Sequence, residues 1–275
     1  MLAKARTLPA DEVVIDLEDA VVPAQKDDAR SATVTALRED GWKARSIAVR
    51  VNGTGTPWFE RDVRELAESA GAALDTIIVP KAEATSGLEE VEQLLESSEA
   101  TAGRSRPLGL QALIETARGL VHVNEIAASS PRLEALIIGY ADLAASLGRP
   151  PGLKHDPDRW SWALDAVVVA ARAAGIQAID GPHLQIADLD GLRAAAARAR
   201  ELGYDGKWAL HPTQVDPLVE IFSPSAAELD AARAIVSALE AAEGEGGAGA
   251  AMLDGEMVDE ASRKLALQVL ARAPE

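Results

Sequence analysis

The stretches LGLQALIET at residues 108–116 and ALIIGYAD at 135–142 set the pattern of this chain. Each is a short apolar run that ends on a carboxylate, Glu115 in the first and Asp142 in the second. Further runs of this form recur about every 30 residues, the length of a βαβ unit. They are VVIDLED (13–19), SIAVRVN (46–52), TIIVPKAE (76–83), IQAID (176–180) and KWALHP (207–212).

These runs predict parallel strands that are buried on both faces, because they are rich in Val, Ile and Leu without alternation. Amphipathic stretches lie between them and predict helices, several of which end at a glycine. Strand–helix alternation without a G-x-G-x-x-G after the first strand favours a TIM (β/α)8-type barrel over a Rossmann fold. In such a barrel the active site lies at the carboxyl ends of the strands. Helices are predicted over residues 25–40, 57–70, 87–97, 117–128, 159–174, 189–202 and 226–242.

The domain organisation follows from the same pattern. Residues 1–242 are predicted to form the barrel, 243–250 (EGEGGAGA) a flexible Gly-rich linker, and 251–275 an appended C-terminal lid or oligomer segment that ends in a helix. Only seven strands are found, and a closed barrel needs eight. Because Leu2–Leu8 is helical in pattern, either the first strand is missing from this chain or the barrel is open at one seam.

Composition limits the partners. The net charge of −17 disfavours nucleic acid and anionic membranes, and no apolar run approaches the roughly 18 residues of a membrane span. The absence of cysteine excludes disulfides, zinc–thiolate sites and thiol nucleophiles. A cytoplasmic protein is the expectation.

Eight phrases in register over nearly the whole chain carry a family resemblance: DLEDAV, RVNG, VPKAE, LIETARGL, GYADLAASLG, AARAAGIQAIDGP, LGYDGKWALHPTQV and DGEMVDEAS. Together they resemble the citrate lyase beta-subunit-like group of the HpcH/HpaI aldolase superfamily, and they are most similar to its malyl-CoA and methylmalyl-CoA lyase branch. The resemblance implies a Mg²⁺-dependent enzyme, with Mn²⁺ as a possible substitute, that cleaves or forms a carbon–carbon bond in a 3-hydroxyacyl-CoA. It also implies a homotrimer or hexamer. Members of this group open with a strand before a Val-Pro-Gly-type loop, which this sequence lacks.

Glu115 and Asp142 end consecutive strands, so both carboxylates can point into one barrel mouth. Mg²⁺ prefers oxygen ligands and uses one or two protein carboxylates with water and substrate. The resemblance makes these two residues the metal ligands, with a 2-oxo acid such as glyoxylate or pyruvate chelating the metal beside Glu115. Two ordinary strand-end acids are the alternative.

Other strand ends offer supporting groups. Glu18 and Asp19 could orient metal-bound water, although Asp19 could instead cap a helix. Arg50 is a planar fork suited to a carboxylate or a developing oxyanion, or to an ion pair that fixes its loop. Lys81 could form a Schiff base, or pair with Glu83 or Asp16, and the resemblance places it in a supporting role.

The resemblance implies a retro-Claisen-type cleavage in which Arg50 stabilises a thioester enolate. Asp259, in the tail's M-V-D, would protonate that enolate from a neighbouring subunit, or the tail could be simple interface packing. Asp180 is expected to be structural or to support the site indirectly. The competing functions are a citrate lyase beta subunit and a non-catalytic barrel that lacks its first strand.

Overall fold

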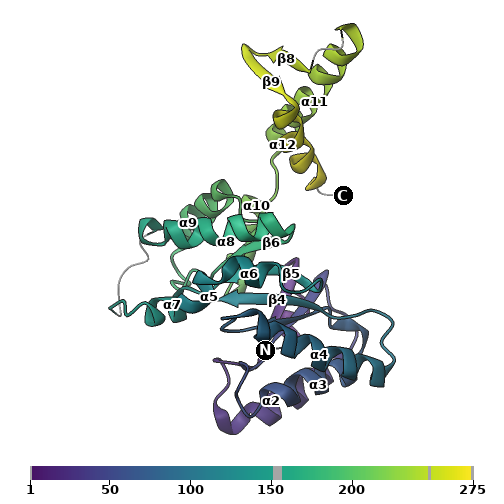
Figure 1. The fold of residues 1–275 in the computed structure, drawn as a ribbon, viewed down its shortest axis with the longest axis vertical. Coiled ribbons are helices and arrows are strands. Elements are labelled where there is room, and N and C mark those ends of the chain that lie inside the picture. Colours follow the sequence, from purple (N-terminus) through teal and green to yellow (C-terminus); the bar gives the residue numbers. More distant parts are fainter. Residues whose placement is uncertain (1, 151–156, 247–248, 274–275) are drawn as a thin grey trace. The chain divides into compact units, whose positions relative to one another are not determined.

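The computed structural model describes residues 2–150, 157–246 and 249–273. Its main sheet contains seven parallel strands in sequential order (Figure 1). Each strand lies within one of the apolar runs or begins one or two residues before it, so the strand predictions are confirmed. The strands are β1 (Glu12–Asp16), β2 (Ser46–Arg50), β3 (Thr76–Val79), β4 (Gly109–Ile114), β5 (Leu133–Ile138), β6 (Gln177–Asp180) and β7 (Gly206–Lys207).

The sheet curls into part of a barrel and is not closed. In the described part of the chain, β1 and β7 each pair with a neighbour on one side only, so an open seam separates them. The central strands β3 and β4 are buried at every position, as expected for strands covered on both faces. A buried cluster of Ala48, Ile78, Leu113 and Ile137 fills the concave side, with Val14, Ile179 and Trp208 partly buried against it.

Helices cover the other face. In Figure 1 α2, α3 and α4 lie side by side over the first strands, and α8 contacts β5 and β6. The helix predicted over 117–128 is divided at His122, and a short helix that the sequence pattern did not predict follows β5. The helices of this part are α1 (Leu2–Ala5), α2 (Lys26–Leu37), α3 (Phe59–Ser69), α4 (Thr85–Ala102), α5 (Ala117–Val121), α6 (Val123–Ala127), α7 (Tyr140–Ser146), α8 (Ser161–Ala174), α9 (Leu189–Leu202) and α10 (Val215–Phe222).

The C-terminal part, Val219–Glu275, forms a separate compact unit. It contains α11 (Ala226–Gly246), an antiparallel hairpin of β8 (Ala250–Leu253) and β9 (Glu256–Asp259), and α12 (Glu260–Ala271). The linker predicted over 243–250 is therefore wrong at both ends, because α11 continues to Gly246 and β8 begins at Ala250; residues 247–248 lie outside the described residues. The division after Leu218 also places α11 with this unit rather than with the barrel.

No helix in the described ranges is both long enough and apolar enough to cross a membrane.

Candidate active site

Arg50 is fixed by Asp16 at the carboxyl end of β1 and β2. The parallel register pairs the two residues directly, so both side chains project from the concave face. Arg50 Nε donates to Asp16 Oδ1 at 2.8 Å, and Nη2 donates to Oδ2 at 2.6 Å. Burial alone would raise the pKa of Asp16, but the hydrogen bonds and charge of Arg50 outweigh burial and hold it below its usual range. Asp16 therefore stays ionised and sets the plane of the guanidinium.

Glu18 lies between the two cations of the site. Its Oε2 is 2.9 Å from Arg50 Nη1, and its Oε1 pairs with Lys81 Nζ. The loop that carries Glu18 is tied down by the buried Lys26, whose Nζ donates to the carbonyl oxygens of Leu17 and Glu18 at 2.8 and 2.6 Å. Glu18 thus orients both cations and is itself held by its backbone.

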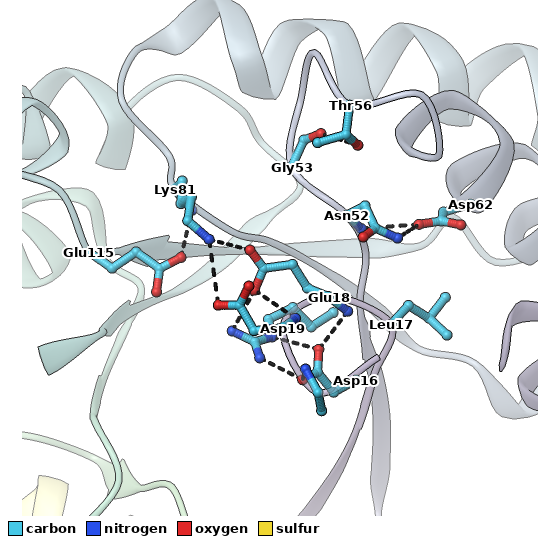
Figure 2. Close-up of polar contacts among 12 residues, drawn as sticks. Asp16, Leu17, Glu18, Asp19, Asn52, Gly53, Thr56, Asp62, Lys81 and Glu115 are labelled. Carbon is cyan, nitrogen blue, oxygen red and sulfur yellow. Dashed lines mark hydrogen bonds and ion pairs between the residues drawn. The ribbon is translucent and has the colours of Figure 1, made fainter. Parts of the chain in front are cut away.

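Lys81 has an unusual backbone. Its φ is +48°, a left-handed conformation that non-glycine residues rarely adopt. This conformation points its N–H at Glu115 Oε1, 2.9 Å away, while Nζ reaches Glu18 and lies 3.6 Å from Asp19 (Figure 2). Such strain is typical of functional sites, where surrounding contacts enforce it.

The ion pairs of Lys81 decide between its alternatives. Its partners are Glu18 and Asp19, not Glu83 or Asp16 as the sequence reading allowed. Burial alone would lower the pKa of Lys81, but the hydrogen bond and charge of Glu18, with those of Glu115 and Asp19, raise it. A Schiff base needs a neutral amine, so this environment opposes covalent catalysis.

Glu115 is the most deeply buried carboxylate of the mouth, with 2% of its surface exposed. It follows β4, and Gly139 after β5 leaves room for it: a Cβ at position 139 would lie 2.6 Å from Glu115 Cβ and Oε2. Burial raises the pKa of Glu115 to about 7, against the lowering effect of the Lys81 N–H, and the charges of Asp142 and Glu18 raise it further. Asp142 lies in the first turn of α7 and is half-buried.

These carboxylates fit a divalent cation. A buried carboxylate whose pKa is raised by burial and by neighbouring acids lacks positive charge, which a metal ion beside Glu115 and Asp142 would supply. Over the ranges that the structure describes, no group of three or more His, Asp or Glu side chains is placed to hold a metal. Two carboxylates are nonetheless the usual number for Mg²⁺, which keeps water and substrate as its other ligands.

Asp259 belongs to the C-terminal unit and caps α12. Its Oδ1 accepts from the N–H groups of Ala261 and Ser262 at 2.9 and 3.2 Å, and Ser262 Oγ accepts from the Asp259 N–H. This capping box is a structural reason for an aspartate at this position.

Sequence reasoning missed Asp16, Tyr140 and Lys207. Asp16 was signalled by strand alternation, which puts it on the same face as Val14 and two residues before Glu18. Tyr140 and Lys207 carried no such signal, because their pairing with Asp180 depends on how three strand ends meet.

Comparisons with known proteins agree with this geometry. The sequence model of the family described as HpcH/HpaI aldolase/citrate lyase matches residues 1–212. The chain is 40% identical to the L-malyl-CoA/beta-methylmalyl-CoA lyase of Cereibacter sphaeroides, over all of this chain and 91% of that protein. It is 38% identical to a (3S)-malyl-CoA thioesterase of the same species, over 99% of this chain and 90% of the relative.

A solved structure extends the comparison. Protein CitE from Mycobacterium tuberculosis, in complex with magnesium, acetoacetate and coenzyme A, is 33% identical and superposes with a TM-score of 0.75. The match covers 96% of this chain and 90% of the other.

Proposed function

This chain belongs to the HpcH/HpaI aldolase/citrate lyase family, and we propose from that premise that it is a carbon–carbon lyase acting on CoA thioesters. Its substrate would be a 3-hydroxyacyl-CoA such as malyl-, methylmalyl- or citramalyl-CoA, cleaved to an acyl-CoA and a 2-oxo acid or formed from them. The observation that carries this proposal is identity to a malyl-CoA lyase over the whole chain, together with the grouping of Arg50, Glu115 and a neighbouring Asp142 at one strand edge.

We propose Glu115 and Asp142 as the ligands of Mg²⁺, or of Mn²⁺ in its place. When bound, the ion would stabilise negative charge on the substrate's hydroxyl and carboxylate oxygens. Glu18, Asp19 and Lys81 would support the site without touching the metal, since Glu18 fixes both cations and the Lys81 N–H holds one Glu115 oxygen. These contacts would keep the carboxylates in place before the metal arrives.

Arg50 would bind the substrate and stabilise the enolate. In the cleavage the hydroxyl loses its proton, the carbon–carbon bond breaks as the new carbonyl forms, and the bonding electrons pass to the thioester as an enolate. Contacts with Asp16 and Glu18 use at most three of the five N–H groups of the guanidinium. The remaining donors can face the enolate oxygen.

The enolate must then take a proton on carbon, and we propose Asp259 as its source. The C-terminal unit would act as a lid that a neighbouring subunit supplies in a trimer or hexamer. The barrel would be completed by an eighth strand, and with no cysteine in the chain a cytoplasmic location fits.

A second candidate is hydrolysis of the thioester, which the 38% identity to a malyl-CoA thioesterase favours. Product analysis separates the two. Incubation of malyl-CoA with the protein and Mg²⁺ should give acetyl-CoA and glyoxylate by the lyase reaction, but malate and free CoA by hydrolysis. Citramalyl-CoA and citryl-CoA in parallel would give pyruvate or oxaloacetate, and preference for citryl-CoA would favour the citrate lyase beta-subunit alternative. Absence of product from all three, in folded protein, would support a non-catalytic barrel.

A further inference from the structure

A buried polar cluster of Tyr140, Asp180 and Lys207 lies on the convex side of the sheet, behind the carboxylates of the mouth. Ile179 packs on the concave cluster, so its neighbour Asp180 projects to the opposite face. Asp180 Oδ1 accepts from the Tyr140 hydroxyl, and Oδ2 is 2.5 Å from Lys207 Nζ. The side chains of Lys207 and Asp180 are 1% and 3% exposed, which keeps them away from substrate.

An ion pair buried to this degree carries a desolvation cost that close geometry and further hydrogen bonds must offset. Lys207 Nζ also donates to the Gly181 carbonyl at 2.6 Å, and Tyr140 completes the cluster through Asp180. Burial and the charge of Asp180 raise the pKa of the Tyr140 hydroxyl, so it remains a donor at all working pH values. The three groups form a connected unit in which Tyr140 has a defined place.

The Tyr140 ring is also held on its other sides. It meets the Trp160 ring edge to face, with centroids 5.2 Å apart, and Lys207 Nζ lies 5.8 Å from its centroid. Gly181 allows the end of β6 to approach the ring: a Cβ there would lie 2.8 Å from it. The ring therefore has little freedom to move.

Tyr140 is the first residue of α7, and Asp142 lies two residues later in the same turn. The helix has no side-chain N-cap, because Gly139 precedes it. Helix ends without such a cap fray readily. The anchored tyrosine replaces the cap as the restraint on this turn.

We propose that Tyr140, held by the Asp180–Lys207 pair, is a positioning residue that fixes the Asp142 carboxylate for metal binding. This inference rests on the proposed metal site. Partners that orient a ligand from outside the metal's own shell are typically worth about 10- to 100-fold in metal affinity. Tyr140 acts in this way through the backbone of α7.

The test is an EPR titration of the intact protein with Mn²⁺ alone. Tyr140→Phe removes the hydroxyl and keeps the ring, and it should raise the Mn²⁺ dissociation constant about tenfold or more. Tyr204→Phe is the matched control: Tyr204 is fully buried and near Asp180, but its hydroxyl donates to the Leu164 carbonyl of α8 at 3.1 Å. Both variants should lose similar thermal stability, whereas only the first should bind Mn²⁺ more weakly.

Asp142→Asn in the same titration separates the two levels of the argument. Weak binding by Asp142→Asn with wild-type binding by Tyr140→Phe would overturn the positioning role and leave the metal site standing. Equal weakening by both tyrosine variants would also overturn it, since general loosening would then explain the loss. Wild-type binding by Asp142→Asn would refute the metal site itself, and the inference with it. Trp160→Phe weakens the same anchor from its other side and replaces Tyr140→Phe if that variant does not fold.

Discussion

Arg50 combines a charge with a fixed plane, and a substitution can separate the two. Lysine keeps the charge but cannot form the two parallel hydrogen bonds to Asp16. We expect Arg50→Lys to lower turnover more than about tenfold, equivalent to about 1.4 kcal/mol of transition-state stabilisation. Arg61→Lys is the control, since Arg61 also pairs with two carboxylates but is exposed. Steady-state kinetics with melting curves measure both, and a folded, fully active Arg50→Lys enzyme would remove Arg50 from the site.

Glu115 predicts how metal binding depends on pH. Metal coordination requires the ionised carboxylate, and the pKa of Glu115 in the metal-free protein is raised to about 7 by burial. Mn²⁺ affinity should therefore fall about tenfold for each pH unit below 7. Titrations at several pH values from 5.5 to 8 measure this slope. Affinity that is constant over this range would mean that Glu115 is not a ligand or is already ionised.

The same group makes an opposite prediction for stability without metal. Between the unfolded value of 4.5 and the folded value of about 7, the folded state binds more protons than the unfolded state. The contribution of Glu115 to stability therefore falls as pH rises through this window. Glu115→Gln should remove that part of the pH dependence in urea unfolding.

At the scale of elements, α12 tests the role of Asp259. Asparagine caps helices as well as aspartate does but cannot donate a carboxylic proton. Asp259→Asn should thus retain the melting temperature and lose turnover by about 100-fold or more, the usual worth of a general acid. Ser262→Ala, which removes one side of the same capping box, is the control for helix stability. If Asp259→Asn keeps its activity, Asp259 is a cap and nothing more.

The sequence predicted the elements well where local pattern decides them. The apolar runs located all seven strands of the main sheet, and Gly175 and Gly203 end α8 and α9 as left-handed caps. The Gly-rich segment misled, because glycine content alone did not show that α11 continues over residues 243–246. The hairpin between β8 and β9 had an available signal in Asp254-Gly255, which adopts positive φ at both positions.

The site divided along the same line. Arg50, Glu18, Lys81 and Glu115 were named from strand ends and the family resemblance, and the structure brings them into contact. The partner of Lys81 was not predictable, because it depends on the left-handed turn at Lys81 itself. Contacts between strands distant in sequence need the folded sheet.

At the scale of the whole molecule, the proposed lid predicts sharing between subunits. Co-expression of Asp259→Asn chains with Glu115→Gln chains should restore activity that neither has alone. Mixed oligomers would contain some mouths with an intact Glu115 and an intact Asp259 from a neighbour. Differently tagged chains purified in tandem establish that the oligomers are mixed, and if these remain inactive while wild type is active, the lid does not act between subunits.

The dependence of cleavage on a divalent metal tests the central claim most directly. Wild-type protein, treated with chelator and then resupplied with Mg²⁺, is assayed for glyoxylate release from malyl-CoA beside Glu115→Gln and Asp142→Asn. We predict that chelation abolishes release, that Mg²⁺ or Mn²⁺ restores it, and that neither folded variant recovers. Release that survives chelation, with borohydride trapping of substrate on Lys81, would contradict the account and establish a Schiff-base aldolase instead.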